Sequence, residues 1–238
     1  MTQKLPLFPL NTVLFPGMPI TLHIFEERYR LMIERCLEQS IPFGVVLIRE
    51  GAEVDPDDPG ARRLREMLGL ARGEEHVPGV DVVPYSVGTT ARISDSVRLK
   101  DGRYYLVAVG QRRFRIQYIA QRRPYMVASV AYLPEESGAA VLEPANRLRA
   151  LYARYWAALA AATGQPHEPE PLPDDVIELT YWLAHRLQVD NVHKQRWLEA
   201  DVATRLREMT AAIRAELALL PGGSDERERG WSGPGSRN

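Results

Sequence analysis

Four prolines, Pro6, Pro9, Pro16 and Pro19, interrupt the strongly apolar opening LPLFPLNTVLFPGMPITLHIFEERYRLMI of this chain, residues 5–33. A proline has no main-chain N–H to donate to a sheet, and its ring disrupts the interior of a helix. The segment is therefore predicted to be neither a central strand nor a helix. It fits a curled sheet, in which it can serve as an edge strand without losing a required ladder bond.

The composition is that of a globular protein, with 45% hydrophobic and 26% charged residues among 238. The net charge of −1 favours neither nucleic acid nor a membrane surface as a partner. Cys36 is the single cysteine, which excludes an internal disulfide and fits a reducing compartment. The opening prolines break any signal-peptide core, and no apolar run approaches the roughly 20 residues of a membrane-spanning helix. We expect a cytoplasmic protein.

The first half of the sequence has the pattern of short strands with one early helix. The runs that predict strands are 13–15, 20–25, 43–48, 82–87, 89–94, 103–110, 113–119 and 125–133. Between the second and third runs, Phe25, Tyr29, Ile33 and Cys36 recur at helical spacing. The Asp101–Gly102 pair predicts a hairpin turn. Many short strands with one helix indicate a small mixed barrel or a curled sheet.

Residues 53–81 are predicted to form a mobile insertion. Both flanks of this segment are rich in acidic residues, proline and glycine. Between the flanks, Leu64, Met67 and Leu68 form an apolar stripe about two turns long, which is too short to be stable as an isolated helix. We expect this stripe either to dock on its own domain or to contact a partner.

The second half has the pattern of helices. A first helix is predicted to start near Pro144 and to stop at Gly164. Asp175 and Glu178 have the spacing of a capping box before a second helix. A long amphipathic segment then follows to Leu220, with a break expected near Asp201. The chain therefore divides near residue 138, with strands before and helices after.

No catalytic residue, cofactor or metal site is predicted. The sequence lacks a phosphate loop, a G-x-G-x-x-G turn, a nucleophile elbow and an H-E-x-x-H motif. His185 and His193 fit exposed helix positions better than a metal site. Cys36 fits a buried, inert thiol better than a nucleophile. The acidic residues at 55–58 fit a solvated loop better than a cation site.

Two basic clusters remain, at residues 111–115 and 121–123. Strand alternation places Arg113 and Arg115 on the face opposite Phe114 and Ile116. We interpret these arginines as an ordinary solvated strand face. The alternative is a patch that faces RNA.

The opening stretch 5–33 resembles the N-terminal substrate-binding domain of the Lon protease family, whose fold is PUA-like. VGTTARI (87–93), DGRYYLVAVGQRRFRI (101–116) and KQRWLEADVATRLREM (194–209) fit the same pattern in the same order. The resemblance implies an α+β fold with a β-rich PUA-like curled sheet or pseudo-barrel at 1–138. It also implies an all-α helical bundle at 139–220, followed by a disordered tail at 221–238.

The resemblance further implies a non-catalytic module that binds exposed, unfolded or degradation-marked polypeptide. Complete Lon proteases add an ATPase module and a serine–lysine peptidase, and this sequence ends before either could fit. Its lysines, Lys4, Lys100 and Lys194, have no peptidase-like setting. We expect a stand-alone recognition domain that could act with a protease or chaperone. An RNA-binding PUA-like module is the alternative.

A surface that recognises unfolded chains needs accessible apolar groups beside a few polar anchors. The opening segment supplies both kinds of group. The candidates for polypeptide binding are Phe8, Pro9, Phe15, Met18, His23, Glu26, Arg28 and Tyr29. As an alternative, Phe8, Phe15 and Tyr29 are core residues. Arg28 follows two carboxylates at the start of a helix, so we expect it to pair with a carboxylate or with loop carbonyls.

Overall fold

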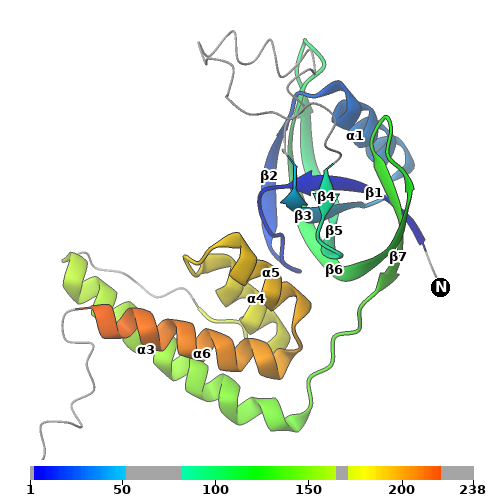
Figure 1. Cartoon of the computed structure of the whole chain (residues 1–238). Helices are drawn as coiled ribbons and strands as arrows, with labels where there is room; N and C mark the ends of the chain where they lie inside the picture. Colours follow the sequence, from blue (N-terminus) through cyan, green and yellow to red (C-terminus); the bar gives the residue numbers. More distant parts are fainter. Residues whose placement is uncertain (1–2, 52–81, 165–170, 221–238) are drawn as a thin grey trace, which may run out of the picture.

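A computed structural model describes residues 3–51, 82–164 and 171–220 and shows an α+β protein (Figure 1). The β-elements are β1 (Gln3–Leu10), β2 (Pro19–Ile24), β3 (Phe43–Glu50), β4 (Val83–Pro84), β5 (Val87–Arg98), β6 (Tyr104–Gln121) and β7 (Met126–Tyr132). The helices are α1 (Glu27–Gln39), the short 3-10 helix η1 (Ala139–Val141), α3 (Leu142–Thr163), α4 (Val176–Arg186), α5 (Asn191–Glu199) and α6 (Val202–Leu219). The predicted insertion 53–81, with Leu64, Met67 and Leu68, and the predicted tail 221–238 lie outside the described residues.

The proline-rich strand β1 closes a small barrel, so the prediction of an edge strand is wrong. β1 pairs antiparallel with β7 through residues 3–7 and parallel with β3 through residues 7–10. The order β1-β7-β6-β5-β3 thereby returns to β1. The prolines are tolerated because Pro6 pairs only with β7 and Pro9 only with β3. Each proline can thus turn its nitrogen toward the side that has no partner strand.

The expected strand at 13–15 is also wrong, because these residues form an irregular link. Their side chains are nevertheless buried, with Leu14 in the barrel core and Val13 and Phe15 among the helices. Pro16 and Gly17 then turn the chain into β2. Gly17 has a φ of 77°, which glycine adopts without strain, and Met18 N–H donates to the Phe15 carbonyl at 3.1 Å.

The predicted strand boundaries in the middle of the chain need two corrections. The runs 103–110 and 113–119 form one strand, β6, because two register shifts against β5 and two against β7 bend it around the barrel. The run 82–87 is divided, because Val83 and Pro84 form the two-residue β4 and Val87 begins β5, which extends beyond 89–94 in both directions. The hairpin turn at Asp101–Gly102 is confirmed, with a positive φ at Gly102.

The helix boundaries follow from their capping residues. The side chains of Asp175, Asp190 and Asp201 accept hydrogen bonds from main-chain N–H groups of α4, α5 and α6. Gly164 ends α3 in the left-handed conformation, and Asp201 marks the predicted break between α5 and α6. The predicted stop and the predicted break are both confirmed.

The barrel and the helices share part of their hydrophobic core. α1 covers the end of the barrel that is distant from the other helices, while α4 and α5 lie between the α3–α6 pair and the barrel (Figure 1). Val13, Phe15, Leu47 and Val87 from the strand half join the cluster formed by the helices. Removing the helices would expose these side chains. Within the described ranges, no helix is long and apolar enough to cross a membrane.

Candidate functional site

A hollow of about 240 Å³ opens between β2, β1 and the start of α1. Its lining residues are Phe8, Leu10, Thr21, Leu22, His23, Ile24, Phe25, Glu26 and Tyr29. Four predicted binding residues, Phe8, His23, Glu26 and Tyr29, therefore meet at this place. Phe8 and Tyr29 are also buried core residues, with ring centroids 4.2 Å apart, so they form a rigid part of the wall.

Glu26 is the acidic group of this hollow. Its residue is only 4% exposed, and it lies directly before α1, where the positive end of the helix dipole favours a carboxylate. Arg28 Nη2 lies 2.8 Å from Glu26 Oε2, and the Arg28 guanidinium covers the Tyr29 ring at 4.6 Å. The expectation that Arg28 pairs with a carboxylate is confirmed.

His23 lies on the outer side of the hollow, where its ring stacks on Tyr105 of β6 at 4.4 Å and 12°. Arg103 Nη1 approaches His23 Nε2 to 3.5 Å. Burial, and then the charge of Arg103, lower the pKa of His23. The imidazole is consequently neutral at physiological pH and serves as an aromatic and hydrogen-bonding group.

The other predicted residues do not meet at this hollow. Phe15 is fully buried among the helices, where its ring lies 6.0 Å from that of Tyr181. Pro9 is buried within β1. Met18 lies in a second cavity. The alternative interpretation of Phe15, as a core residue and not a binding residue, is therefore confirmed.

The second cavity is a cleft of about 510 Å³ between the barrel and α4. Its lining residues are Pro16, Gly17, Met18, Gln111, Arg112, Arg113, Leu133, Pro134, Glu135, Pro173, Ile177, Glu178 and Tyr181. Met18, Leu133 and Ile177 are partly exposed apolar groups of its walls. Arg112 and Glu178 add charges of opposite sign. The cleft thus combines apolar walls with polar anchors, as a polypeptide site requires.

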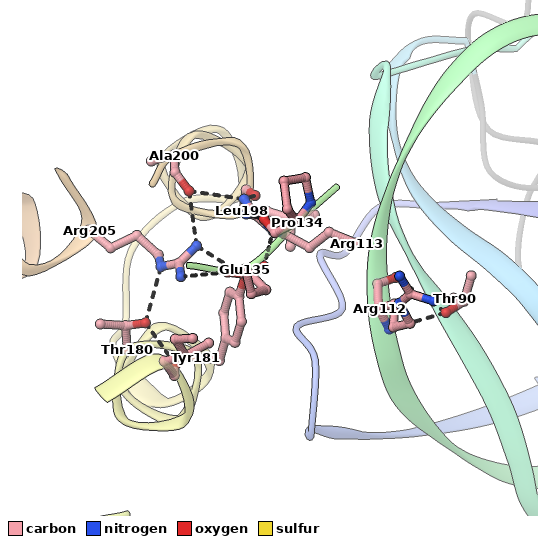
Figure 2. A network of polar contacts seen from close by, with 11 residues as sticks. Thr90, Arg112, Arg113, Pro134, Glu135, Thr180, Tyr181, Leu198, Ala200 and Arg205 are labelled. Carbon is pink, nitrogen blue, oxygen red and sulfur yellow. Dashed lines mark hydrogen bonds and ion pairs between the residues drawn. The ribbon is translucent and has the colours of Figure 1, made fainter. Parts of the chain in front are cut away.

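Arg113 fixes one side of this cleft (Figure 2). Only 5% of the residue is exposed, and its Nε pairs with the Glu135 carboxylate. Its Nη1 donates to the carbonyls of Leu198 at 2.6 Å and Ala200 at 2.9 Å, at the C-terminal end of α5. These carbonyls lie at the negative end of the helix dipole and favour a guanidinium. Arg113 thereby ties β6 to the helices.

Glu135 and Arg205 complete the network from the other side. Arg205 is fully buried in α6, and its Nη2 lies 3.2 Å from Glu135 Oε2. Its Nη1 donates to the Tyr181 hydroxyl at 3.0 Å, while that hydroxyl donates to Glu135. Burial raises the pKa of Tyr181 above its ordinary value, so the phenol keeps its proton. One carboxylate between two buried guanidinium groups fixes the barrel relative to the helices.

Sequence reasoning missed this network. Arg113 was expected on a solvated strand face, and that interpretation is wrong, because the helices cover the outer face of β6 at this point. Arg113 cannot contribute to a patch that faces RNA, because it is buried, whereas Arg115 is exposed. One signal was available, since Arg205 interrupts the apolar face formed by Val202, Leu206 and Met209.

The prediction that Cys36 is buried is confirmed. Cys36 is 2% exposed on the inner face of α1. Burial raises the pKa of its thiol to about 12. A thiol that stays protonated is a poor nucleophile.

The sequence comparisons identify one family. Residues 4–214 match the ATP-dependent protease La (LON) substrate-binding domain. The chain is 29% identical over 142 residues to Lon protease 2 of Myxococcus xanthus, covering 59% of this chain and 14% of that protein. It is 27% identical over 229 residues to Lon protease 2 of Sorangium cellulosum, covering 92% of this chain and 25% of that protein. The chain therefore spans a quarter or less of these relatives.

Solved structures share the fold. A Lon N-terminal domain protein from Xanthomonas campestris superimposes with a TM-score of 0.55 at 24% identity, covering 92% of this chain and 99% of that one. The N-terminal domain of Mycobacterium avium complex Lon protease superimposes with a TM-score of 0.59 at 18% identity, covering 89% and 98%.

Proposed function

Because the chain belongs to the family of ATP-dependent protease La (LON) substrate-binding domains, we propose that it binds exposed segments of unfolded polypeptide in the cleft between β6 and α4. The role is recognition without cleavage. In this role the domain selects clients and does not cleave them.

The observation that carries the proposal is the composition of the cleft. Its volume of about 510 Å³ falls within the roughly 300–1,000 Å³ of usual ligand sites. Met18, Leu133 and Ile177 offer apolar contact to client side chains. Arg112, whose guanidinium lies over the Tyr132 ring at 4.2 Å, and Glu178 offer partners for client main-chain or charged groups. Such a lining suits apolar segments of varied sequence.

The rigid frame of the cleft supports the same role. The Arg113–Glu135–Arg205 network joins the strand that forms one wall to the helices that form the other. A preformed site loses less conformational entropy on binding than a site that must first be assembled. The cleft can therefore bind a disordered client without a compensating ordering step of its own.

The test is binding of fluorescein-labelled, chemically unfolded casein, followed by anisotropy. Met18→Asp places a carboxylate on an apolar wall of the cleft. It should weaken binding by about tenfold or more, the effect expected when one apolar side-chain contact is lost and a charge is desolvated. Leu219→Asp is the matched control, because Leu219 is 85% exposed on α6 and lies outside the cleft lining.

The casein should be recovered intact after incubation with ATP and magnesium, since the proposed role includes no cleavage. If wild-type protein does not bind unfolded casein, the proposed function is wrong. If Met18→Asp and Leu219→Asp bind equally well, the cleft is not the site.

A further inference from the structure

Within the part of the chain that the structure describes, one edge of the strand β2 has no partner strand. β2 pairs antiparallel with β6 from Pro19 to Ile24, and no other strand of the described residues pairs with it. The remaining long strands of the barrel each have two neighbours, because β1 closes the ring. In Figure 1, β2 forms the outer side of the barrel, next to β6. An unpaired edge presents main-chain donors and acceptors to any extended chain.

The register identifies which groups face this edge. Gly110 N–H donates to the Met18 carbonyl at 2.9 Å, so the main-chain carbonyl of Met18 points toward β6 just before β2 begins. Hydrogen-bonded pairs alternate along an antiparallel ladder, so Ile20, Leu22 and Ile24 direct their main-chain groups toward β6. The N–H and C=O groups of Thr21 and His23 must then point to the free edge.

The side chains beside this edge are incompletely covered. Ile20 and Leu22 pack against the barrel core, yet both remain partly exposed. Next to them lies the hollow of about 240 Å³, walled by Phe8 and Leu10 of β1. This volume is below that of usual ligand sites, so it suits one or two side chains of a longer molecule.

We propose that β2 accepts an extended polypeptide segment as an added strand, with an apolar side chain of that segment in the hollow. The proposal rests on the proposed polypeptide-binding function and specifies its mode. The chemistry of the edge selects this occupant, since alternating N–H and C=O groups complement a peptide main chain of any sequence. The edge is also continuous with the cleft, because Met18, which lines the cleft, directly precedes Pro19.

Strand addition would join the hollow beside β2 and the cleft between β6 and α4 into one continuous binding surface for a client. The extended segment lies along the six residues of β2, and its continuation reaches the cleft at the Pro16–Met18 turn. Main-chain pairing supplies affinity that is independent of client sequence, and the hollow adds a preference for an apolar residue. A recognition domain for unfolded chains needs both properties.

The first test replaces Thr21 by proline. Thr21→Pro removes an N–H that faces the free edge and adds a ring there, while the β2–β6 ladder keeps its bonds. The probe is a fluorescein-labelled peptide of about ten residues that alternates leucine and threonine, a length that covers a strand with its flanks. Binding should weaken about tenfold or more in Thr21→Pro, and by less than about twofold in the control Thr21→Ala.

The second test leaves the protein unchanged and so does not depend on folding of a variant. Two versions of the peptide carry N-methyl groups on every leucine or on every threonine. In an added strand, one alternating set of N–H groups faces β2 and the other faces away. One methylated version should therefore lose binding and the other should retain it. If both versions bind as well as the parent peptide, or both fail, strand addition is wrong.

The remaining outcomes are also decisive. If the peptide and unfolded casein bind but Thr21→Pro has no effect, the function stands and the β2 mode is wrong. If neither probe binds wild-type protein, the proposed function itself fails. If Thr21→Pro instead abolishes a dimer that wild-type protein forms in analytical ultracentrifugation, the occupant of the edge is a second copy of the chain, and the client proposal is overturned.

Discussion

The β6 segment around Arg113 and the free edge of β2 belong to the same barrel and differ in what covers them. Arg113 points outward from β6 into a buried network with Glu135 and α5. Thr21 also points outward, but it is exposed. Strand alternation assigns both side chains to the outer face of the barrel. It does not show whether helices or solvent cover that face. The covered face ties the barrel to the helices, and the uncovered edge is where we propose that a client strand is added.

Glu135→Ala should cause the largest loss of stability, because it removes the carboxylate at the centre of the covered region. This change leaves Arg113 and Arg205 without their shared carboxylate, and unpairing a buried charge costs about 3–5 kcal/mol. Urea unfolding followed by tryptophan fluorescence should show a loss of that size. Glu136→Ala is the matched control, because Glu136 is exposed and should change stability by less than about 0.5 kcal/mol. Equal midpoints for the two variants would contradict the structural role of the network.

Arg28→Ala tests the corresponding ion pair at the hollow. Arg28 donates to the nearly buried Glu26, and hydrogen bonds to charged groups contribute about 1.5–3 kcal/mol. We expect a loss within that range, and a smaller loss than for Glu135→Ala. Arg49→Ala serves as control, since Arg49 and Glu50 form an exposed pair that contributes little. A thermal midpoint of Arg28→Ala equal to that of wild type would refute the stabilising role.

The cap of α6 gives a prediction with a defined pH dependence. Hydrogen bonds from the Thr204 main-chain N–H lower the pKa of Asp201 below its ordinary value of 3.8. A carboxyl group whose folded pKa is lowered stabilises the protein above its unfolded pKa and loses that effect as the pH falls through the folded pKa. Asp201→Ala should therefore cost about 1 kcal/mol at neutral pH.

The charge-dependent part of this cost should be lost in acid, so that Asp201→Ala costs less there than at neutral pH. Denaturant unfolding at neutral pH and at a pH below the folded pKa of Asp201 measures the difference. The exposed Asp174, which does not cap α4 with its side chain, provides the Asp174→Ala control. A cost of Asp201→Ala that stays constant down to acid pH would contradict the electrostatic part of this cap.

The parts of the fold that depend on neighbours in sequence were predictable. The cap at Asp175, the break near Asp201, the stop at Gly164 and the turn at Asp101–Gly102 each rest on a few adjacent residues. The position of β1 was not predictable in this way. The pairing of β1 is divided between β7 and β3. Whether each proline removes a ladder hydrogen bond therefore depends on two strands that are distant in the sequence.

The candidate site shows the same limit. Glu26 and Tyr29 were predicted near His23 because a strand-to-helix turn keeps them together. The Arg113–Glu135–Arg205 network joins residues 22 to 70 positions apart at each contact, and no local pattern brings them together. An arginine on the apolar face of a helix was the one sequence signal of a buried polar partner.

The smallest expected effect on stability is at the open edge of β2, where a substitution tests whether this edge lacks a partner strand. Thr21→Pro should lower the free energy of unfolding by less than about 1 kcal/mol, because its nitrogen carries no ladder bond to β6. Leu22→Pro is the contrasting change on the next residue. It removes an N–H that points to β6 and should cost at least about 1 kcal/mol more. Urea unfolding of both variants measures the difference. Equal losses would mean that Thr21 and Leu22 do not face opposite edges of β2, and the free edge would then have to be reassigned.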